Sequence, residues 1–162
     1  MVLYFTGTGN SRYLARRIAE GLEMPLYDLN ACIKAGNTAP VQTGRDVVLA
    51  TPTYAWRIPR VVSEWLGKTA LTGAERIWFV MDCGSEIGNA AGYNRQLAAK
   101  KQLQYMGTAQ IIMPENYIAM FNAPQAEQAR RIVEQAEPAL QKVLAQLRAG
   151  QEFSPLRDTL YD

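Results

Sequence analysis

The apolar residues of the chain gather in short unbroken runs that are separated by longer stretches of mixed polarity. The clearest runs cover residues 2–5, 47–50, 77–81 and 111–113, and a weaker one covers 25–29. Runs that are rich in β-branched and aromatic residues, without polar alternation, are typical of strands buried on both faces. The pattern therefore predicts five strands of a parallel sheet.

The stretches between these runs carry apolar residues at helical spacing. The clearest stretch lies over 12–22, where apolar side chains share one face and arginines the other. Further helices are expected after Pro59, over 90–103 and over 125–149, and Pro138 should bend or interrupt the last of these. Strands and helices that alternate in this way predict an α/β fold, a three-layer sandwich with helices on both faces of the sheet.

Length and composition fit one such domain over residues 1–150, followed by a tail over 151–162. The chain has 162 residues, of which 17 are basic and 15 acidic, so its formal net charge of +2 does not indicate a nucleic-acid partner. It contains no histidine and two cysteines, which argues against triad hydrolases and cysteine-rich metal centres. We predict no catalytic residue, metal site or membrane span, and place the protein in a reducing cytoplasm.

The loop after the first strand has the chemistry of a phosphate site. Its residues are Thr6, Gly7, Thr8, Gly9, Asn10 and Ser11. Two glycines let the backbone approach an anion, and hydroxyl, amide and backbone N–H donors lie where a helix begins. A Ser/Thr-rich turn that merely caps the helix is the simpler alternative.

Two nucleotide motifs come close to this loop without matching it. A Gly-Lys-Ser/Thr ending is absent, which disfavours a nucleoside triphosphatase. The spacing from Gly7 and Gly9 to Asp28 approaches that of a dinucleotide fingerprint, but Arg12 stands where a small residue is expected. Dinucleotide binding stays open as an alternative.

The loop after the predicted strand 47–50 presents aromatic residues between two prolines. Its candidate ligand-binding residues are Pro52, Thr53, Tyr54, Ala55 and Trp56. Rigid exposed aromatics suit a flat ligand, on which each ring can stack. Alternatively, the indole of the last residue plugs the end of the sheet against the next helix.

The loop after the predicted strand 77–81 contributes Asp82, Cys83, Gly84 and Gly88. The glycines again allow close backbone approach to a ligand. Asp82 either accepts a hydrogen bond from the ligand's edge or caps the loop. Cys83 is interpreted as a packing residue, because no basic neighbour in the sequence would lower the pKa of its thiol.

A phosphate loop, an aromatic loop and a glycine loop at the same end of one sheet fit a phosphorylated planar heterocycle such as FMN. These segments resemble those of flavodoxins. More narrowly, residues 4–11, 87–90 and 113–117 resemble the flavodoxin half of bacterial flavodoxin–ferredoxin fusion proteins, although the cysteine-rich ferredoxin motifs are absent. The resemblance spans residues 1 to 148.

The resemblance implies a sheet in the order 2-1-3-4-5, FMN as cofactor, and electron transfer to or from a redox protein such as a ferredoxin or an iron–sulfur enzyme. Flavin chemistry needs no acid–base residue, which agrees with the absence of histidine. Two alternatives share the fold: an FMN-dependent NAD(P)H:quinone-type reductase, and a domain that has lost flavin and serves as a binding module. The segment 116–124 either covers the flavin, docks a partner or belongs to the core.

Overall fold

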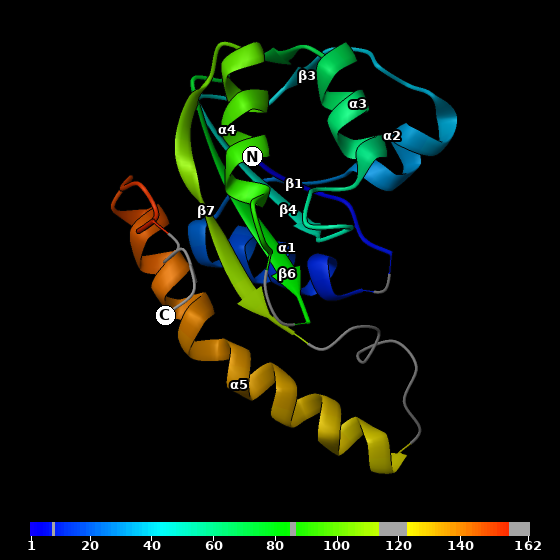
Figure 1. Ribbon diagram of the computed structural model, residues 1–162, viewed down its shortest axis with the longest axis vertical. Coiled ribbons are helices and arrows are strands. Elements are labelled where there is room, and N and C mark those ends of the chain that lie inside the picture. The colour runs from blue at the N-terminus through cyan, green and yellow to red at the C-terminus, as the bar shows by residue number, and fades with distance from the viewer. Residues whose placement is uncertain (8, 85–86, 114–122, 156–162) are drawn as a thin grey trace.

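A computed structural model of the chain describes residues 1–7, 9–84, 87–113 and 123–155. Its centre is a five-stranded sheet in the order β2-β1-β4-β6-β7, in which every pair of neighbours is parallel (Figure 1). The strands are β1 (Val2–Tyr4), β2 (Leu26–Asp28), β4 (Asp46–Pro52), β6 (Arg76–Cys83) and β7 (Gln104–Ile112). The predicted five-stranded parallel sheet is confirmed.

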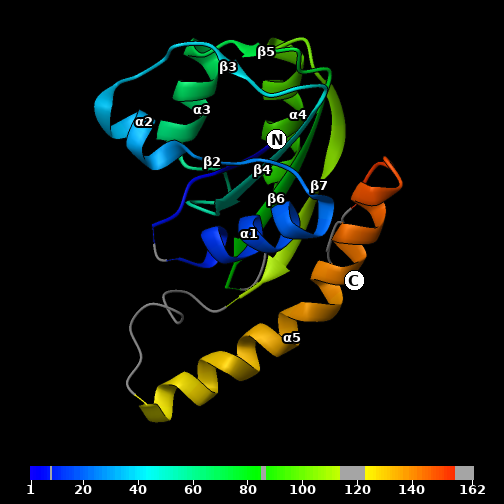
Figure 2. The ribbon, with the colours of Figure 1, turned by 180° about the vertical axis from the view of Figure 1, so that it is seen from behind.

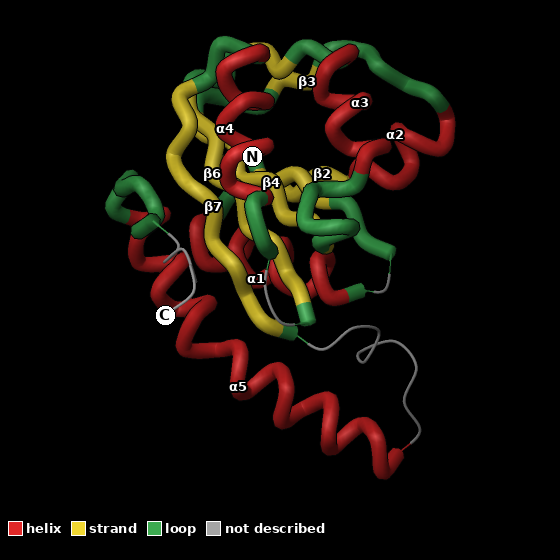
Figure 3. The backbone as a smooth tube through the Cα atoms, in the orientation of Figure 1, coloured by secondary structure: helices red, strands yellow, loops and turns green. Residues whose placement is uncertain are grey.

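Helices cover both faces of this sheet. They are α1 (Asn10–Leu22), α2 (Leu29–Ala35), α3 (Arg60–Lys68), α4 (Ala90–Lys100) and α5 (Ala123–Arg148). Helices α1 and α5 pack on one face, and α2, α3 and α4 pack on the other, as Figures 2 and 3 show. The α/β three-layer arrangement expected from the sequence is therefore present.

Two short strands were not predicted from the sequence. β3 (Val41–Gln42) and β5 (Leu71–Thr72) form a separate two-stranded parallel sheet. Their presence changes the numbering, so the order of the main sheet is 2-1-4-6-7 rather than the expected 2-1-3-4-5. A strand of two residues is too short to show any periodicity, which explains why the pattern missed both.

The last strand, β7, begins seven residues earlier than the apolar run at 111–113 suggests. It is the edge strand of the sheet, and along it buried Met106 and Thr108 alternate with half-buried Tyr105, Gly107 and Ala109. An edge strand with one solvated side has mixed polarity, so the search for unbroken apolar runs found only its end.

The start of the predicted C-terminal tail is part of the packed domain. Phe153 is only 6% exposed, and its backbone N–H donates to the carbonyl of Met106 at 2.8 Å. Trp78 donates its indole N–H to the carbonyl of Gln151, also at 2.8 Å. Gln151 and Phe153 therefore hold the start of this segment against the sheet.

The core consists of two apolar clusters, one on each side of the sheet. Successive residues of β6 alternate between them: Trp78 belongs to the cluster under α1 and α5, and Phe79 to the cluster under α3 and α4. Pro138 lies within α5, which continues through it, and Figure 1 shows the helix changing direction between its gold and orange parts. No helix in the described ranges has the length and apolar character needed to cross a membrane.

Candidate functional site

The carboxyl ends of β1, β4 and β6 meet at one edge of the sheet. The register places Tyr4 beside Ala50 and Pro52 beside Asp82, so all three strands end close together. Beyond Tyr4, the backbone N–H of Phe5 still donates to the carbonyl of Ala50 at 3.1 Å. The three loops singled out from the sequence therefore start from neighbouring points of one edge, where open parallel sheets bind ligands.

Two glycine contacts join these loops directly. A Cβ atom placed on Gly7 would lie 2.6 Å from the hydroxyl oxygen of Tyr54, so the phenol rests against the first loop. A Cβ atom on Gly88 would lie 2.7 Å from the Cδ1 atom of Trp56, so the indole rests against the third. The aromatic loop thus spans the space between the other two.

The first loop leads into α1 with its amide groups directed toward the edge of the sheet. Gly9, with φ of 103°, is the N-cap residue, and as a glycine it makes no side-chain capping bond to the helix. The Thr6 hydroxyl accepts the N–H of Gly9 at 2.8 Å and keeps its own hydrogen for another acceptor. An uncapped first turn leaves N–H groups that an anion can accept.

A side chain that the sequence analysis did not identify holds the first loop in place. Asn30 in α2 accepts the N–H of Thr6 at 3.0 Å and donates to the carbonyl of Thr6 at 2.7 Å. Asp28 caps α2 by accepting the N–H of Asn30 at 2.8 Å. The capping aspartate and Gly36 at the other end of the helix were signals that could have revealed α2.

The second loop is a tight hairpin. Tyr54 and Arg57 exchange two backbone hydrogen bonds of 2.8 and 3.1 Å, and the two residues between them, Ala55 and Trp56, have φ values of 49° and 59°. This is the backbone of a two-residue turn in which both central positions are left-handed. It leaves Tyr54 48% and Trp56 61% exposed. An indole so exposed does not plug the end of the sheet.

The only arginine within these three loops is turned toward a neighbouring helix. The guanidinium carbon of Arg57 lies 4.1 Å from the ring centre of Tyr93 in α4, which is a cation–π distance. The predicted anion site in the first loop therefore consists of uncharged donors. Negative charge placed there would be met by hydroxyl, amide and backbone N–H groups rather than by a cation.

The third loop begins with a buried carboxyl group. Asp82 is 6% exposed, accepts the hydroxyl of Ser11 through Oδ2, and its backbone carbonyl accepts the hydroxyl of Thr53 at 2.9 Å. Burial raises the pKa of Asp82 to about 6, although the bond from Ser11 opposes this shift. Partial burial of the Tyr54 phenol, together with the charge of Asp82, raises the pKa of Tyr54. The Ser11–Asp82 bond thus ties the first loop to the third.

Of the five remaining predicted residues, the structure describes four. Asn10 is buried at the start of α1, Pro52 ends β4, Cys83 is buried at the end of β6, and Gly84 is exposed beyond it. The burial of Cys83 agrees with its interpretation as a packing residue. Thr8 lies outside the described residues, as does nearly all of the segment 116–124.

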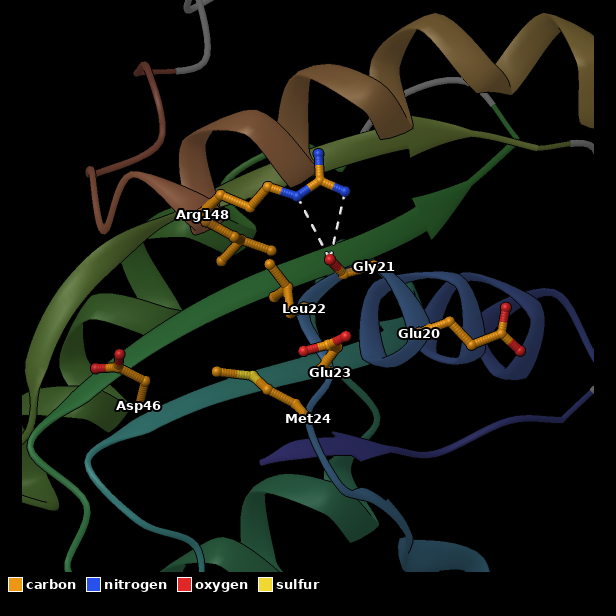
Figure 4. A pocket seen from close by; sticks show the side chains of 8 residues that line it. Glu20, Gly21, Leu22, Glu23, Met24, Asp46 and Arg148 are labelled. Atoms are coloured by element: carbon orange, nitrogen blue, oxygen red, sulfur yellow. Dashed lines mark hydrogen bonds between the residues drawn. The ribbon is translucent and has the colours of Figure 1, made fainter.

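A hollow of about 470 Å³ lies at the opposite edge of the sheet (Figure 4). Its lining residues are Glu20, Gly21, Leu22, Glu23, Met24, Asp46, Leu147 and Arg148. The Arg148 guanidinium donates to the Gly21 carbonyl at 3.3 Å, and the carboxylates of Glu20 and Asp46 lie on opposite sides of the view. The polar groups do not converge on one point, so we assign no site there.

Comparison with solved structures identifies the fold. General stress protein 14 of Treponema denticola, solved in complex with FMN, matches with a TM-score of 0.56 at 13% identity, covering 93% of this chain and 98% of that chain. A flavodoxin from the domain Archaea matches with a TM-score of 0.54 at 13% identity, covering 85% and 96%. No model of a known protein family matches the chain, and no curated protein does. The chain has the flavodoxin-like fold.

Proposed function

We propose that this protein binds FMN at the carboxyl edge of its sheet and carries electrons between redox partners through the flavin. The observation that carries the proposal is the convergence of three loops, with Tyr54 resting on Gly7 and Trp56 resting on Gly88. The similarity in fold to a protein solved with FMN supports the choice of this cofactor. When bound, FMN supplies the redox chemistry, and the protein supplies position and electrostatics.

The residues present fit the parts of this cofactor. The uncapped first turn of α1, with Thr6, Gly7, Thr8, Gly9, Asn10 and Ser11, would hold the phosphate. Tyr54 and Trp56 would pack against the ring system, with Pro52, Thr53 and Ala55 shaping their loop. Asp82, Cys83, Gly84 and Gly88 would line the opposite side. A set of neutral donors leaves the phosphate charge uncompensated, which disfavours further negative charge on the ring and favours a low reduction potential.

We place the electron exchange with a separate redox protein, such as a ferredoxin or an iron–sulfur enzyme, in a reducing cytoplasm. The exposed indole of Trp56 lies on a hairpin that projects from the edge of the sheet, where a partner can approach a bound ring. An aromatic hairpin that covers the ring favours exchange through the ring's edge over an open substrate cavity. The reductase alternative requires such a cavity.

The first test is an absorption spectrum of the purified protein followed by titration with FMN. We expect one FMN per chain, with quenched flavin fluorescence. Failure to bind FMN contradicts the proposal and favours a binding module that lacks flavin. Steady-state NAD(P)H oxidation, with and without a quinone, then separates carrier from reductase. A carrier gives no quinone-dependent oxidation but exchanges electrons with a reduced ferredoxin, whereas quinone-dependent turnover would favour the reductase.

A further inference from the structure

The bond between Ser11 and Asp82 uses a donor that the predicted phosphate site needs. A serine hydroxyl has one hydrogen, so it can donate to only one acceptor at a time. Here that hydrogen goes to Oδ2 of Asp82. Ser11 is 2% exposed and Asp82 is 6% exposed, so water cannot readily replace either partner.

We infer, on the basis of the proposed function, that FMN binding requires Asp82 to take up a proton. With a hydrogen on its carboxyl group, Asp82 donates to the Ser11 oxygen and releases the Ser11 hydrogen to the phosphate. The balance is one proton taken from solvent onto Asp82 for each phosphate bound. Asp82 is then the residue that positions Ser11 rather than a direct ligand of the ring.

The charges around Asp82 support this assignment. Its carboxyl group faces α1 and the ends of the neighbouring strands. Within the described part of the chain, the charge of Asp82 acts on Tyr54 in the neighbouring loop, and α1 carries five charged or titratable residues beyond Ser11, namely Arg12, Tyr13, Arg16, Arg17 and Glu20. Arg17 is paired with Glu137, and the charges of Arg12 and Arg16 act on Tyr4.

No cation of the described chain therefore compensates an ionised Asp82. A phosphate dianion in the first loop would add a second negative charge beside a buried one, which strongly disfavours the ionised carboxyl group. Burial has already raised its pKa to about 6, so the proton is accessible near neutral pH.

The test compares FMN affinity in the wild type and in Asp82→Asn by flavin fluorescence from about pH 5.5 to about pH 8.5. The amide of asparagine donates to Ser11 as the protonated acid would. The phosphate itself titrates near pH 6, but its effect cancels in the ratio of the two dissociation constants. We expect the ratio of the dissociation constants, wild type over Asp82→Asn, to rise by about tenfold per pH unit well above pH 6 and to be roughly fiftyfold larger at pH 8 than at pH 6.

Glu64→Gln is the control, because Glu64 is an exposed carboxylate in α3, outside the three loops. The ratio of the FMN dissociation constants of this variant and the wild type should not change with pH. A second measurement needs no variant: calorimetric titration of the wild type with FMN at pH 7.5, in two buffers of different ionisation enthalpy, should reveal uptake of about one proton. Parallel pH profiles or no proton uptake, with FMN bound normally, would overturn the inference alone. Absence of FMN binding to either protein at every pH would overturn the proposed function instead.

Discussion

The two edges of the sheet each hold a carboxyl group, and their surroundings shift the pKa values of the two groups in opposite directions. At the amino edge, Asp46 receives the Arg76 guanidinium through two hydrogen bonds, Nε to Oδ1 at 2.8 Å and Nη2 to Oδ2 at 3.0 Å. This pairing lowers the pKa of Asp46. At the carboxyl edge, Asp82 has the Ser11 hydroxyl as its side-chain donor, and burial raises its pKa.

This difference in the two carboxyl environments indicates which edge of the sheet is the better candidate for a ligand site. Removing one partner of a paired charge destabilises the fold, and a buried charge without a cation costs free energy of folding. Such a cost is expected at a site that binds a ligand, where the geometry suits the complex rather than the free protein. The contrast therefore supports a functional role for the edge that holds Asp82.

The largest expected effect is a pair of opposite changes in stability. Asp46→Asn should lower the free energy of unfolding at pH 8 by about 1 to 2 kcal/mol, because it breaks a charge-assisted hydrogen-bonded pair. Asp82→Asn should raise it by roughly 2 kcal/mol, because it removes a buried charge. Urea unfolding of the FMN-free variants measures both. A loss of stability in both variants would refute the contrast between the two edges.

The same pair predicts opposite responses to pH. Because its pKa in the folded state is lowered, Asp46 contributes stability above its unfolded pKa of 3.8, and this contribution is lost as the pH falls. Because its pKa in the folded state is raised, Asp82 costs stability as the pH rises from about 4 to about 6. The wild type should therefore lose stability across that interval, and Asp82→Asn should lose less.

A smaller effect is expected from removing the exposed indole. Trp56→Ala should weaken FMN binding by about ten- to thirtyfold, or about 1.4 to 2 kcal/mol, which lies within the roughly 1 to 3 kcal/mol that stacking on an aromatic side chain contributes. The free energy of unfolding should change by less than about 0.5 kcal/mol, since the side chain is 61% exposed. Leu26→Ala, at an exposed apolar residue of β2, is the control and should leave FMN affinity unchanged. Equal affinities of Trp56→Ala and the wild type would remove the indole from the site.

The smallest expected effect comes from replacing a glycine of positive φ in the first loop and comparing it with the same replacement outside the site. Gly9→Ala places a side chain at φ of 103° and should cost about 1 kcal/mol of stability. It should also weaken FMN binding several-fold by displacing the start of α1. Gly36→Ala, at φ of 65° beyond the end of α2, should cost similar stability without a loss of affinity. Comparable losses of FMN affinity in both variants would argue against a special role for the first loop.

Much of the fold could be predicted because local patterns determine it. Strands β1, β4 and β6 are buried on both faces, so their apolar runs were recognisable. The loops that follow them were located by position, since ligand sites in open parallel sheets lie beyond the carboxyl ends of the strands. The sequence predicted only the end of the edge strand β7, because polar and apolar residues are mixed along that strand.

The decisive contacts of the site could not be predicted, because they join residues far apart in the chain. The Ser11 hydroxyl meets Asp82 across 71 positions, and Asn30 reaches back 24 positions to Thr6. Neither the edge-acceptor nor the loop-cap interpretation of Asp82 anticipated that its carboxyl group binds another predicted site residue. Periodicity and motifs report neighbours in sequence, whereas such pairs depend on the packed geometry of the whole domain.

The hairpin at Tyr54–Arg57 has a consequence for how quickly a ligand can enter. Its backbone is closed by two hydrogen bonds and turns within two residues, so the segment carrying the indole has little internal freedom. Ring flips of single side chains cannot open much of the edge. If FMN binds here as proposed, its entry and exit would require the hairpin to move as one unit, and the residence time should follow the rate of that collective movement.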